Sequence, residues 1–413
     1  MAPAVLNVML LDDSTYPAAD RCPFGPARAI SGASAKPFKL HISDQELLEW
    51  RQLLQLSKIG PLVYENSQED RRFGITHKWL SDAKDYWLNT FDWRAQESRI
   101  NSFANYLIDI EPEITVHFVA LFSSRKDAVP VILMHGWPGS FIEFIPILTL
   151  LRERYPSADD LPYHFVVPSL PGYTLSSGGP LEQNWTLQDS TRVMDKLMRN
   201  LGFEKYIAQG GDVGSFLAHQ LSAQYPGCVG AHLNLLRPKD LLSDTDGLQP
   251  HEVAAIERAK KWQVTGNAYA LEHATRPGTI GLVLSSSPLA LLTWIGEKFL
   301  EWTDEDPSLD TILTNVSLYW FTQGFPRSIY PYRALFGPDA LSTERLEKPT
   351  GYSYFQWEIM PGIKKHLEKE VNLVHYSYHE RGGHFGALER PKELLQDVEE
   401  YIKLAWKAGT AKL

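Results

Sequence analysis

The stretch Gln209-Gly210-Gly211-Asp212-Val213-Gly214-Ser215 decides how this chain folds. Residues 205–208 before it are β-prone, and the run 216–221 after it is typical of the beginning of a helix. A strand that turns sharply into a helix, with glycines on both sides of one polar residue, has the form of a nucleophile elbow, because glycine accepts backbone angles and close approaches that a Cβ would prevent. The polar residue at the turn is Asp212, so the stretch predicts a carboxylate nucleophile; the alternative is an ordinary turn with a solvated aspartate.

A carboxylate nucleophile implies a particular chemistry. It forms an ester with a carbon atom of the substrate, which suits displacement at an alkyl carbon better than acyl transfer. The ester must then be hydrolysed. The remaining sequence should therefore supply a base that activates water, an acid that orients the base, and amides that hold an oxyanion.

The composition limits the kinds of molecule that this protein is expected to bind and the compartment in which it is expected to work. The chain has 413 residues, of which 44% are hydrophobic, and 40 basic against 50 acidic residues give a net charge of −10. This balance predicts no binding to nucleic acid or to anionic lipid. Cys22 and Cys228 lie far apart and form neither a disulfide framework nor a zinc pattern, which favours a reducing, cytoplasmic location. The apolar segment 5–11 is short and lacks a preceding basic region, so we expect no signal peptide and no membrane anchor.

Around the elbow, apolar strands alternate with helices, which predicts an α/β fold with a mostly parallel sheet. The expected strands are 106–110, 114–121, 129–134, 164–168, 205–208, 229–235, 351–355 and 373–378. The expected helices of this part are 142–154, 187–201 and 392–407. The alternation stops between 237 and 345, where a helical, aromatic-rich insertion is expected to form a lid. Helices are also expected from Ser43-Asp44 and at 78–88.

The sequence thus predicts an α/β-hydrolase-like core with an inserted helical lid and an N-terminal helical extension. Its parts are an irregular N-terminal arm (1–36), the helical extension (37–100), the first part of the core (101–236), the lid (237–345) and the second part of the core (346–413).

The oxyanion donors are expected on two loops. His135-Gly136-Trp137-Pro138-Gly139-Ser140 follows the apolar strand 129–134, and such a loop can direct a backbone N–H at the reaction centre. The second donor is the N–H of the residue after the nucleophile. We therefore expect the backbone amides of Trp137 and Val213 to form the oxyanion hole.

The base and its orienting acid are expected after the last strands of the sheet. His384 lies on a glycine-rich loop after the final predicted strand, in the nucleophile-then-histidine order of α/β-hydrolases. His135 is its only rival and is interpreted as ordering the oxyanion loop. Glu358, one strand earlier, is the favoured acid over Asp240, while Glu380 is expected to face solvent.

Several motifs together resemble the epoxide hydrolases of the α/β-hydrolase superfamily, most closely the microsomal-type branch and its soluble fungal members. The resemblance runs from about Pro37 to the C-terminus. It implies a core sheet, a helical lid and an N-terminal extension that wraps the core and often contributes to a homodimer. Its anchors are Phe73-Gly74-Ile75-Thr76, Asp92-Trp93-Arg94, His135-Gly136-Trp137-Pro138-Gly139-Ser140, Pro168-Ser169-Leu170-Pro171-Gly172-Tyr173, Gly210-Gly211-Asp212-Val213-Gly214-Ser215 and Gly382-Gly383-His384-Phe385.

The resemblance also implies two lid tyrosines that act as acids on the epoxide oxygen. By motif these are Tyr269 and Tyr332, with Tyr330 as an alternative to the second, and the same match carries over Glu358 as the acid. The implied reactants are a small apolar epoxide and water, with no cofactor and no metal.

Three other functions fit the sequence less well. A haloalkane dehalogenase would share the aspartate and the histidine, but it would place a halide-binding tryptophan where Val213 stands. A serine esterase is disfavoured because the elbow carries Asp212. A non-catalytic protein of this fold that binds a small apolar ligand is disfavoured because every catalytic position is filled.

Overall fold

The computed structural model describes residue 24, residues 35–336 and residues 344–410. Its described part contains a nine-stranded sheet in the order β1-β2-β3-β5-β4-β6-β7-β8-β9. The predicted irregular arm, 1–36, lies almost wholly outside the described residues. The strands are β1 (Lys36–Phe38), β2 (Ala104–Glu111), β3 (Ile114–Leu121), β4 (Val129–Met134), β5 (Tyr163–Pro168), β6 (Tyr206–Gly210), β7 (Cys228–Leu233), β8 (Leu346–Phe355) and β9 (Val371–His379).

The sheet is antiparallel on one side and parallel on the other. Strands β1, β2, β3 and β5 pair in antiparallel fashion, whereas β5, β4, β6, β7, β8 and β9 pair in parallel. Every residue of β4, β6 and β7 is buried, as expected for central strands covered on both faces. The mostly parallel α/β prediction is therefore confirmed.

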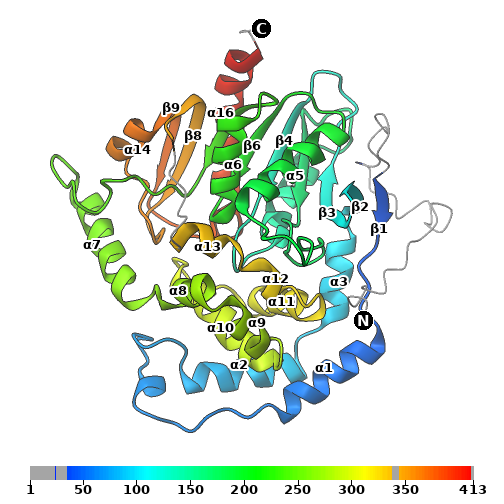
Figure 1. Ribbon diagram of the computed structural model, residues 1–413, viewed down its shortest axis with the longest axis vertical. Helices are drawn as coiled ribbons and strands as arrows, with labels where there is room; N and C mark the ends of the chain where they lie inside the picture. The colour runs from blue at the N-terminus through cyan, green and yellow to red at the C-terminus, as the bar shows by residue number, and fades with distance from the viewer. Residues whose placement is uncertain (1–23, 25–34, 337–343, 411–413) are drawn as a thin grey trace.

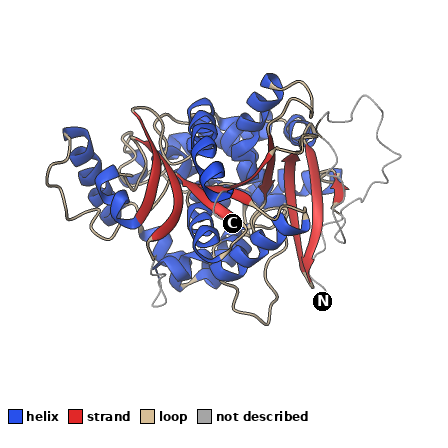
Figure 2. Cartoon of the chain, turned by 90° about the horizontal axis from the view of Figure 1, so that it is seen from above, coloured by secondary structure: helices blue, strands red, loops and turns tan. Residues whose placement is uncertain are grey.

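Helices cover both faces of the sheet (Figure 2). Helix α6 packs on β4, β6 and β7 beside α5, and α16 packs on β7, β8 and β9 beside α4. Helix α6 begins at Val213, three residues before the predicted run, because the turn after β6 leads directly into it. The helices of this core are η4 (Phe141–Phe144), α4 (Ile145–Arg154), α5 (Leu187–Asn200), α6 (Val213–Gln224), α14 (Lys364–Glu370), α15 (Gly386–Glu389) and α16 (Pro391–Thr410).

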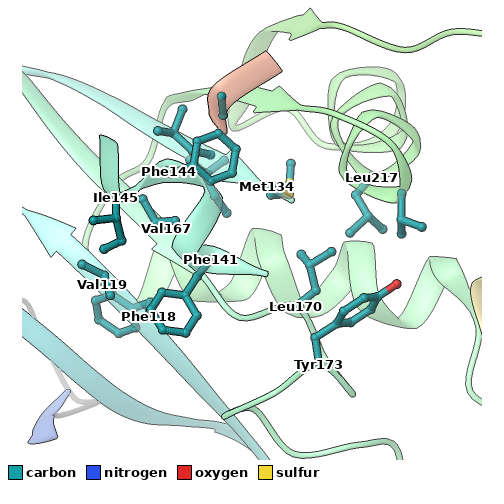
Figure 3. Close-up of a cluster of buried hydrophobic side chains, with 14 of the residues drawn as sticks. Phe118, Val119, Met134, Phe141, Phe144, Ile145, Val167, Leu170, Tyr173 and Leu217 are labelled. Carbon is teal, nitrogen blue, oxygen red and sulfur yellow. The ribbon is translucent and has the colours of Figure 1, made fainter. Parts of the chain in front are cut away.

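The hydrophobic core gathers beside the end of β4. Figure 3 shows Phe144 of η4 and Leu217 of α6 on either side of Met134, and Phe118 of β3 near Phe141. These side chains are at most 2% exposed. Tight packing here fixes the position of the loop that follows β4, because a close-packed interior tolerates little displacement.

A layer of helices is inserted in the sequence between β7 and β8. In Figure 1 most of this layer lies below the sheet, and we call its members the inserted helices. They are α7 (Pro250–Thr265), α8 (Ala268–Thr275), α9 (Pro277–Leu284), α10 (Pro288–Glu301), α11 (Leu309–Phe321), α12 (Phe325–Ser328) and α13 (Pro331–Phe336). Of the described helices, none is long and apolar enough alone to cross a membrane; α9 and α10 reach that length and composition only as a pair bent by 117°.

The N-terminal extension packs beneath the inserted helices (Figure 1). It contains α1 (Asp44–Leu56), η3 (Glu65–Ser67), α2 (His77–Asn89) and α3 (Trp93–Asn101). The Ser43 hydroxyl accepts from the amide of Glu46, whose carboxylate accepts from the amide of Ser43, so the predicted first helix begins with a capping box. The buried Trp87 of α2 donates from its indole to Ser317 of α11 at 3.2 Å.

Candidate active site

Four loops meet at one edge of the sheet, beyond the carboxyl ends of β4, β6, β8 and β9. The parallel register aligns Met134 with Gly210, and Gly210 with Leu233. The residues that follow these strand ends therefore converge. This edge is where ligands bind in open α/β sheets.

The elbow holds Asp212 in a strained conformation. Its φ is 47° and its ψ is −126°, a region that residues with a Cβ rarely adopt. A Cβ at Gly210 would collide with the backbone carbonyl of Gly214, and a Cβ at Gly214 would collide with the carbonyl of Met134. The two glycines thus let the turn close tightly against β4, and the carboxylate stands at the N-terminus of α6.

The loop after β4 places a backbone donor on the carboxylate. The Trp137 amide donates to Oδ1 of Asp212 at 2.8 Å. Val213 is the first residue of α6, where backbone amides have no partner within the helix. The predicted oxyanion donors therefore flank Asp212, as the elbow geometry requires.

Helix α11 holds this loop in place. The Asn315 side chain donates to the carbonyl of Pro138 at 2.5 Å and accepts from the Ser140 hydroxyl at 2.7 Å. The Tyr319 hydroxyl donates to the carbonyl of Gly139 at 2.8 Å. An inserted helix thus fixes the backbone that carries the Trp137 amide.

His384 lies between two carboxylates. Its Nδ1 is 2.8 Å from Oε1 of Glu358, and its Nε2 is 3.4 Å from Oδ2 of Asp212. The side chains of His384 and Glu358 are each 1% exposed. Burial disfavours the imidazolium, but the carboxylates of Glu358 and Asp212 outweigh it and hold the pKa of His384 well above its usual value.

The rivals for these roles make other contacts. Asp240 is exposed and 3.7 Å from the ammonium of Lys369, and Glu380 faces solvent as predicted. His135 is buried, and its Nε2 accepts a hydrogen bond from the Leu170 amide, in the loop after β5, at 3.2 Å. Burial lowers the pKa of His135 to about 4, so this ring remains neutral.

The two tyrosines expected from the resemblance lie together beside Trp137. The ring centres of Tyr269 and Tyr332 are 5.6 Å apart, and they lie 5.4 Å and 5.7 Å from that of Trp137. Burial first, and the charge of Asp212 second, raise the pKa of the Tyr269 phenol well above its usual value. Tyr330 lies apart from this pair, since its hydroxyl bonds that of Ser190 at 2.6 Å.

Sequence reasoning missed one acid of the site. Glu143 of η4 lines a space of about 320 Å³ together with Trp137, Asp212 and His384. Its Oε1 is buried without a hydrogen-bond partner, and a Cβ at residue 139 would occupy the place of this oxygen, which explains the glycine there. Burial raises the pKa of Glu143 to about 8. In the sequence, nothing distinguishes this glutamate from one on a helix surface.

The arrangement can perform a displacement followed by a hydrolysis. It offers a carboxylate with a backbone donor, a buried histidine held by a second carboxylate, and two buried phenols beside the ring of Trp137. Among the described residues, no three His, Cys, Asp or Glu side chains gather as a metal site would require.

Two family models match the chain in overlapping stretches. Residues 35–144 match the model for the N terminus of epoxide hydrolases. Residues 129–234 match the model for the alpha/beta hydrolase fold. The first match covers the N-terminal extension and the second covers the elbow.

Individual relatives match over nearly the whole length. A predicted epoxide hydrolase of Dothistroma septosporum is 42% identical over 380 residues, which cover 90% of each chain. Epoxide hydrolase 1 of Sus scrofa is 30% identical, covering 91% of this chain and 90% of that protein. Among solved structures, the epoxide hydrolase of Aspergillus niger superposes with a TM-score of 0.87 at 47% identity, covering 92% of this chain and 99% of that one.

Proposed function

The chain belongs to the epoxide hydrolases, and from that premise we propose that it converts an epoxide to a vicinal diol through a covalent ester on Asp212. One observation carries the proposal: His384 lies between Glu358 and Asp212, while the Trp137 amide bonds the other oxygen of Asp212. This arrangement suits a carboxylate that is first a nucleophile and then an ester under attack.

In the first step, a carboxylate oxygen of Asp212 attacks one ring carbon of the epoxide. The bond from that carbon to the epoxide oxygen breaks, and the oxygen takes a proton from Tyr269 while Tyr332 donates a hydrogen bond. The raised pKa values keep both phenols protonated at neutral pH, so each is available as a donor. The product of this step is a hydroxyalkyl ester of Asp212.

In the second step, Nε2 of His384 takes a proton from a water molecule, and the hydroxide attacks the ester carbonyl of Asp212. The Trp137 and Val213 amides stabilise the oxyanion, a contribution of about 2.7–4 kcal/mol for each such donor. Glu358 holds the imidazole in the required tautomer and stabilises the imidazolium. His384 returns its proton to the departing diol oxygen, and the acid proton of Asp212 restores the Tyr269 phenol.

The domain organisation, the location, the oligomeric state and the role expected from the sequence belong to the same proposal. Residues 237–345 act as a lid over the core segments 101–236 and 346–413, and 37–100 form the extension behind the arm 1–36. The enzyme works in the cytoplasm as a homodimer on small apolar epoxides, in detoxification, with water as its only other reactant and no cofactor. The inserted position of Tyr269 and Tyr332 supports the lid assignment, because it places both phenols in the same layer.

A single turnover in heavy-oxygen water tests the two-step scheme. The label should first enter the peptide that contains Asp212 and should appear in the diol only in later turnovers. Direct attack of water on the epoxide would instead label the diol at once, and that result would contradict the proposal. Mass spectrometry of the peptide and of the diol distinguishes the two.

Substitution of the base provides a second test. His384→Gln should accumulate the ester, visible as a mass increase equal to that of the epoxide. Asp212→Ala should show no adduct and no diol. A styrene-type epoxide and a chloroalkane, assayed side by side, distinguish this activity from that of a dehalogenase: only the epoxide should be consumed.

A further inference from the structure

A buried lysine lies behind the first phenol. Lys298 of α10 is 2% exposed, and its Nζ is 4.4 Å from the centre of the Tyr269 ring. The same atom is 5.9 Å from the ring of Trp302, whose indole lies 5.0 Å from the His384 imidazole. Its ion-pair partner is the neighbouring Glu297. The first of these rings is that of the proposed acid, and the second packs against the ring of the proposed base.

Burying an ammonium group is costly. The carboxylates near Lys298 on its own helix, Glu297 and Glu301, could interact with an exposed ammonium as well, so they do not explain why this lysine is buried. Lysines that only pair with a neighbouring glutamate lie at the surface of this protein. Lys260 and Glu257 of α7 are such a pair, with side chains 43% and 62% exposed. The position of Lys298 is better explained by the ring that it faces.

We propose that Lys298 is a positioning residue that makes Tyr269 a stronger acid. During ring opening, the proton of the Tyr269 hydroxyl passes to the epoxide oxygen, and negative charge spreads over the phenolate ring. A cation at the ring face attracts this charged ring more strongly than it attracts the neutral phenol, so the interaction increases as the transition state forms. The inference rests on the proposed role of Tyr269 and adds the group that tunes it.

Lys298 should therefore affect the first chemical step and not the second. Lys298→Met keeps the length of the side chain and removes the charge, and we expect ester formation to slow by about 10- to 100-fold. Ester hydrolysis should change by less than about twofold, because it depends on His384 and the backbone amides. Lys298→Arg, which keeps a cation at the ring face, should restore most of the rate.

The experiment measures both steps by rapid acid quench and intact-mass detection of the ester, with styrene oxide as the substrate. Lys260→Met is the matched control, because it removes an exposed lysine from its glutamate on the inserted helices. Glu297→Gln removes the partner of Lys298 but leaves the ammonium, so it should form the ester at nearly the parent rate. If Lys298→Met does not fold, Lys298→Gln provides the same comparison.

A double substitution shows whether Lys298 acts through Tyr269. In the Tyr269→Phe background the effect of Lys298→Met on ester formation should vanish, since no phenolate forms. An equal effect in both backgrounds would overturn the inference, as would a parent-like rate in Lys298→Met. If Glu297→Gln proved as slow as Lys298→Met, the ion pair would be structural and the inference wrong. A parent-like rate in Tyr269→Phe would instead contradict the proposed role of Tyr269.

Discussion

The charge of Asp212 acts on His384, and esterification removes that charge. As a carboxylate, Asp212 lies 3.4 Å from Nε2 of His384 and helps to raise the pKa of that imidazole. As an ester, it is neutral and no longer favours the imidazolium. The first step thus removes a charge that favours the imidazolium, so a larger fraction of His384 is neutral, and able to accept a proton, when the second step begins.

This change predicts how ester hydrolysis depends on pH. The neutral imidazole is the active form, so the rate should rise with pH through the pKa of His384 in the ester and then level off. That pKa should lie below the value in the free enzyme. Glu358, which lies on the other side of the ring, keeps acting on His384 in both states.

Two measurements check the prediction. Rapid quench of a single turnover gives the decay of the ester at each pH, and NMR titration of the imidazole gives the pKa of the free enzyme. A hydrolysis rate that falls with rising pH would contradict the role of His384 as the base. Equal pKa values in the two states would contradict the role of the Asp212 charge.

Site residues that stand in a recognisable motif can be predicted from the local sequence. Site residues that only the folding of the chain brings to the site cannot. Asp212 and His384 stand in glycine-rich loops after strands, so their positions were predictable, and the structure brings them together. Glu358 needed only the order of the strands. Glu143 and Lys298 stand on η4 and α10 like surface residues, and tertiary packing alone buries them against the site.

At the scale of elements, the turn between β6 and α6 depends on close contact with β4. Gly214→Ala would place a methyl group against the Met134 carbonyl, and neither strand nor helix can yield without moving the nucleophile. We expect a loss of about 2–4 kcal/mol in the free energy of unfolding, together with loss of activity. Chemical denaturation and diol formation measure the two effects.

Gly278 provides the matched control on α9. A Cβ at this position would meet nothing within 4 Å. Gly278→Ala should therefore leave both stability and turnover close to those of the parent. If Gly214→Ala were equally harmless, the turn would be looser than the contacts of its backbone indicate.

Elements with a strong hydrophobic pattern were predicted, and short or weakly patterned ones were not. The apolar run of β4 was predicted at residues 129–134, and the structure confirms these bounds. Strand β1 was missed because it has three residues and pairs with β2, almost seventy positions later, a contact that no local pattern reveals. Helix α3 was missed because few of its nine residues are apolar.

At the scale of the whole molecule, the N-terminal extension supports the loop that carries the Trp137 amide, and it does so through α11. The ring centres of Trp87 in α2 and Trp50 in α1 are 5.4 Å apart, and the Trp87 indole donates a hydrogen bond to the Ser317 hydroxyl of α11. Two residues before and two after Ser317, Asn315 and Tyr319 bond the backbone of 138–139. A single helix thus connects the extension to the Trp137 amide.

Trp87→Ala should therefore impair both stability and catalysis. Truncating a fully buried tryptophan typically costs about 3–5 kcal/mol in the free energy of unfolding. Because α11 loses a contact opposite the loop, turnover should fall at temperatures where the variant remains folded. Leu62→Ala, at a side chain 66% exposed, is the control and should change neither quantity. Normal turnover in folded Trp87→Ala would contradict the connection through α11.

The inserted helices interrupt the chain between β7 and β8, which are neighbours in the sheet. The genetic consequence is that one continuous coding segment specifies the inserted helices with Tyr269 and Tyr332, while Asp212, Glu358 and His384 are encoded outside it. Selection can therefore reshape substrate preference without touching the hydrolytic machinery. Tyr269 and Tyr332, the proposed proton donors, lie inside that segment. A lineage that replaced the whole segment would therefore lose both donors. Inherited variation should concentrate between these two codons.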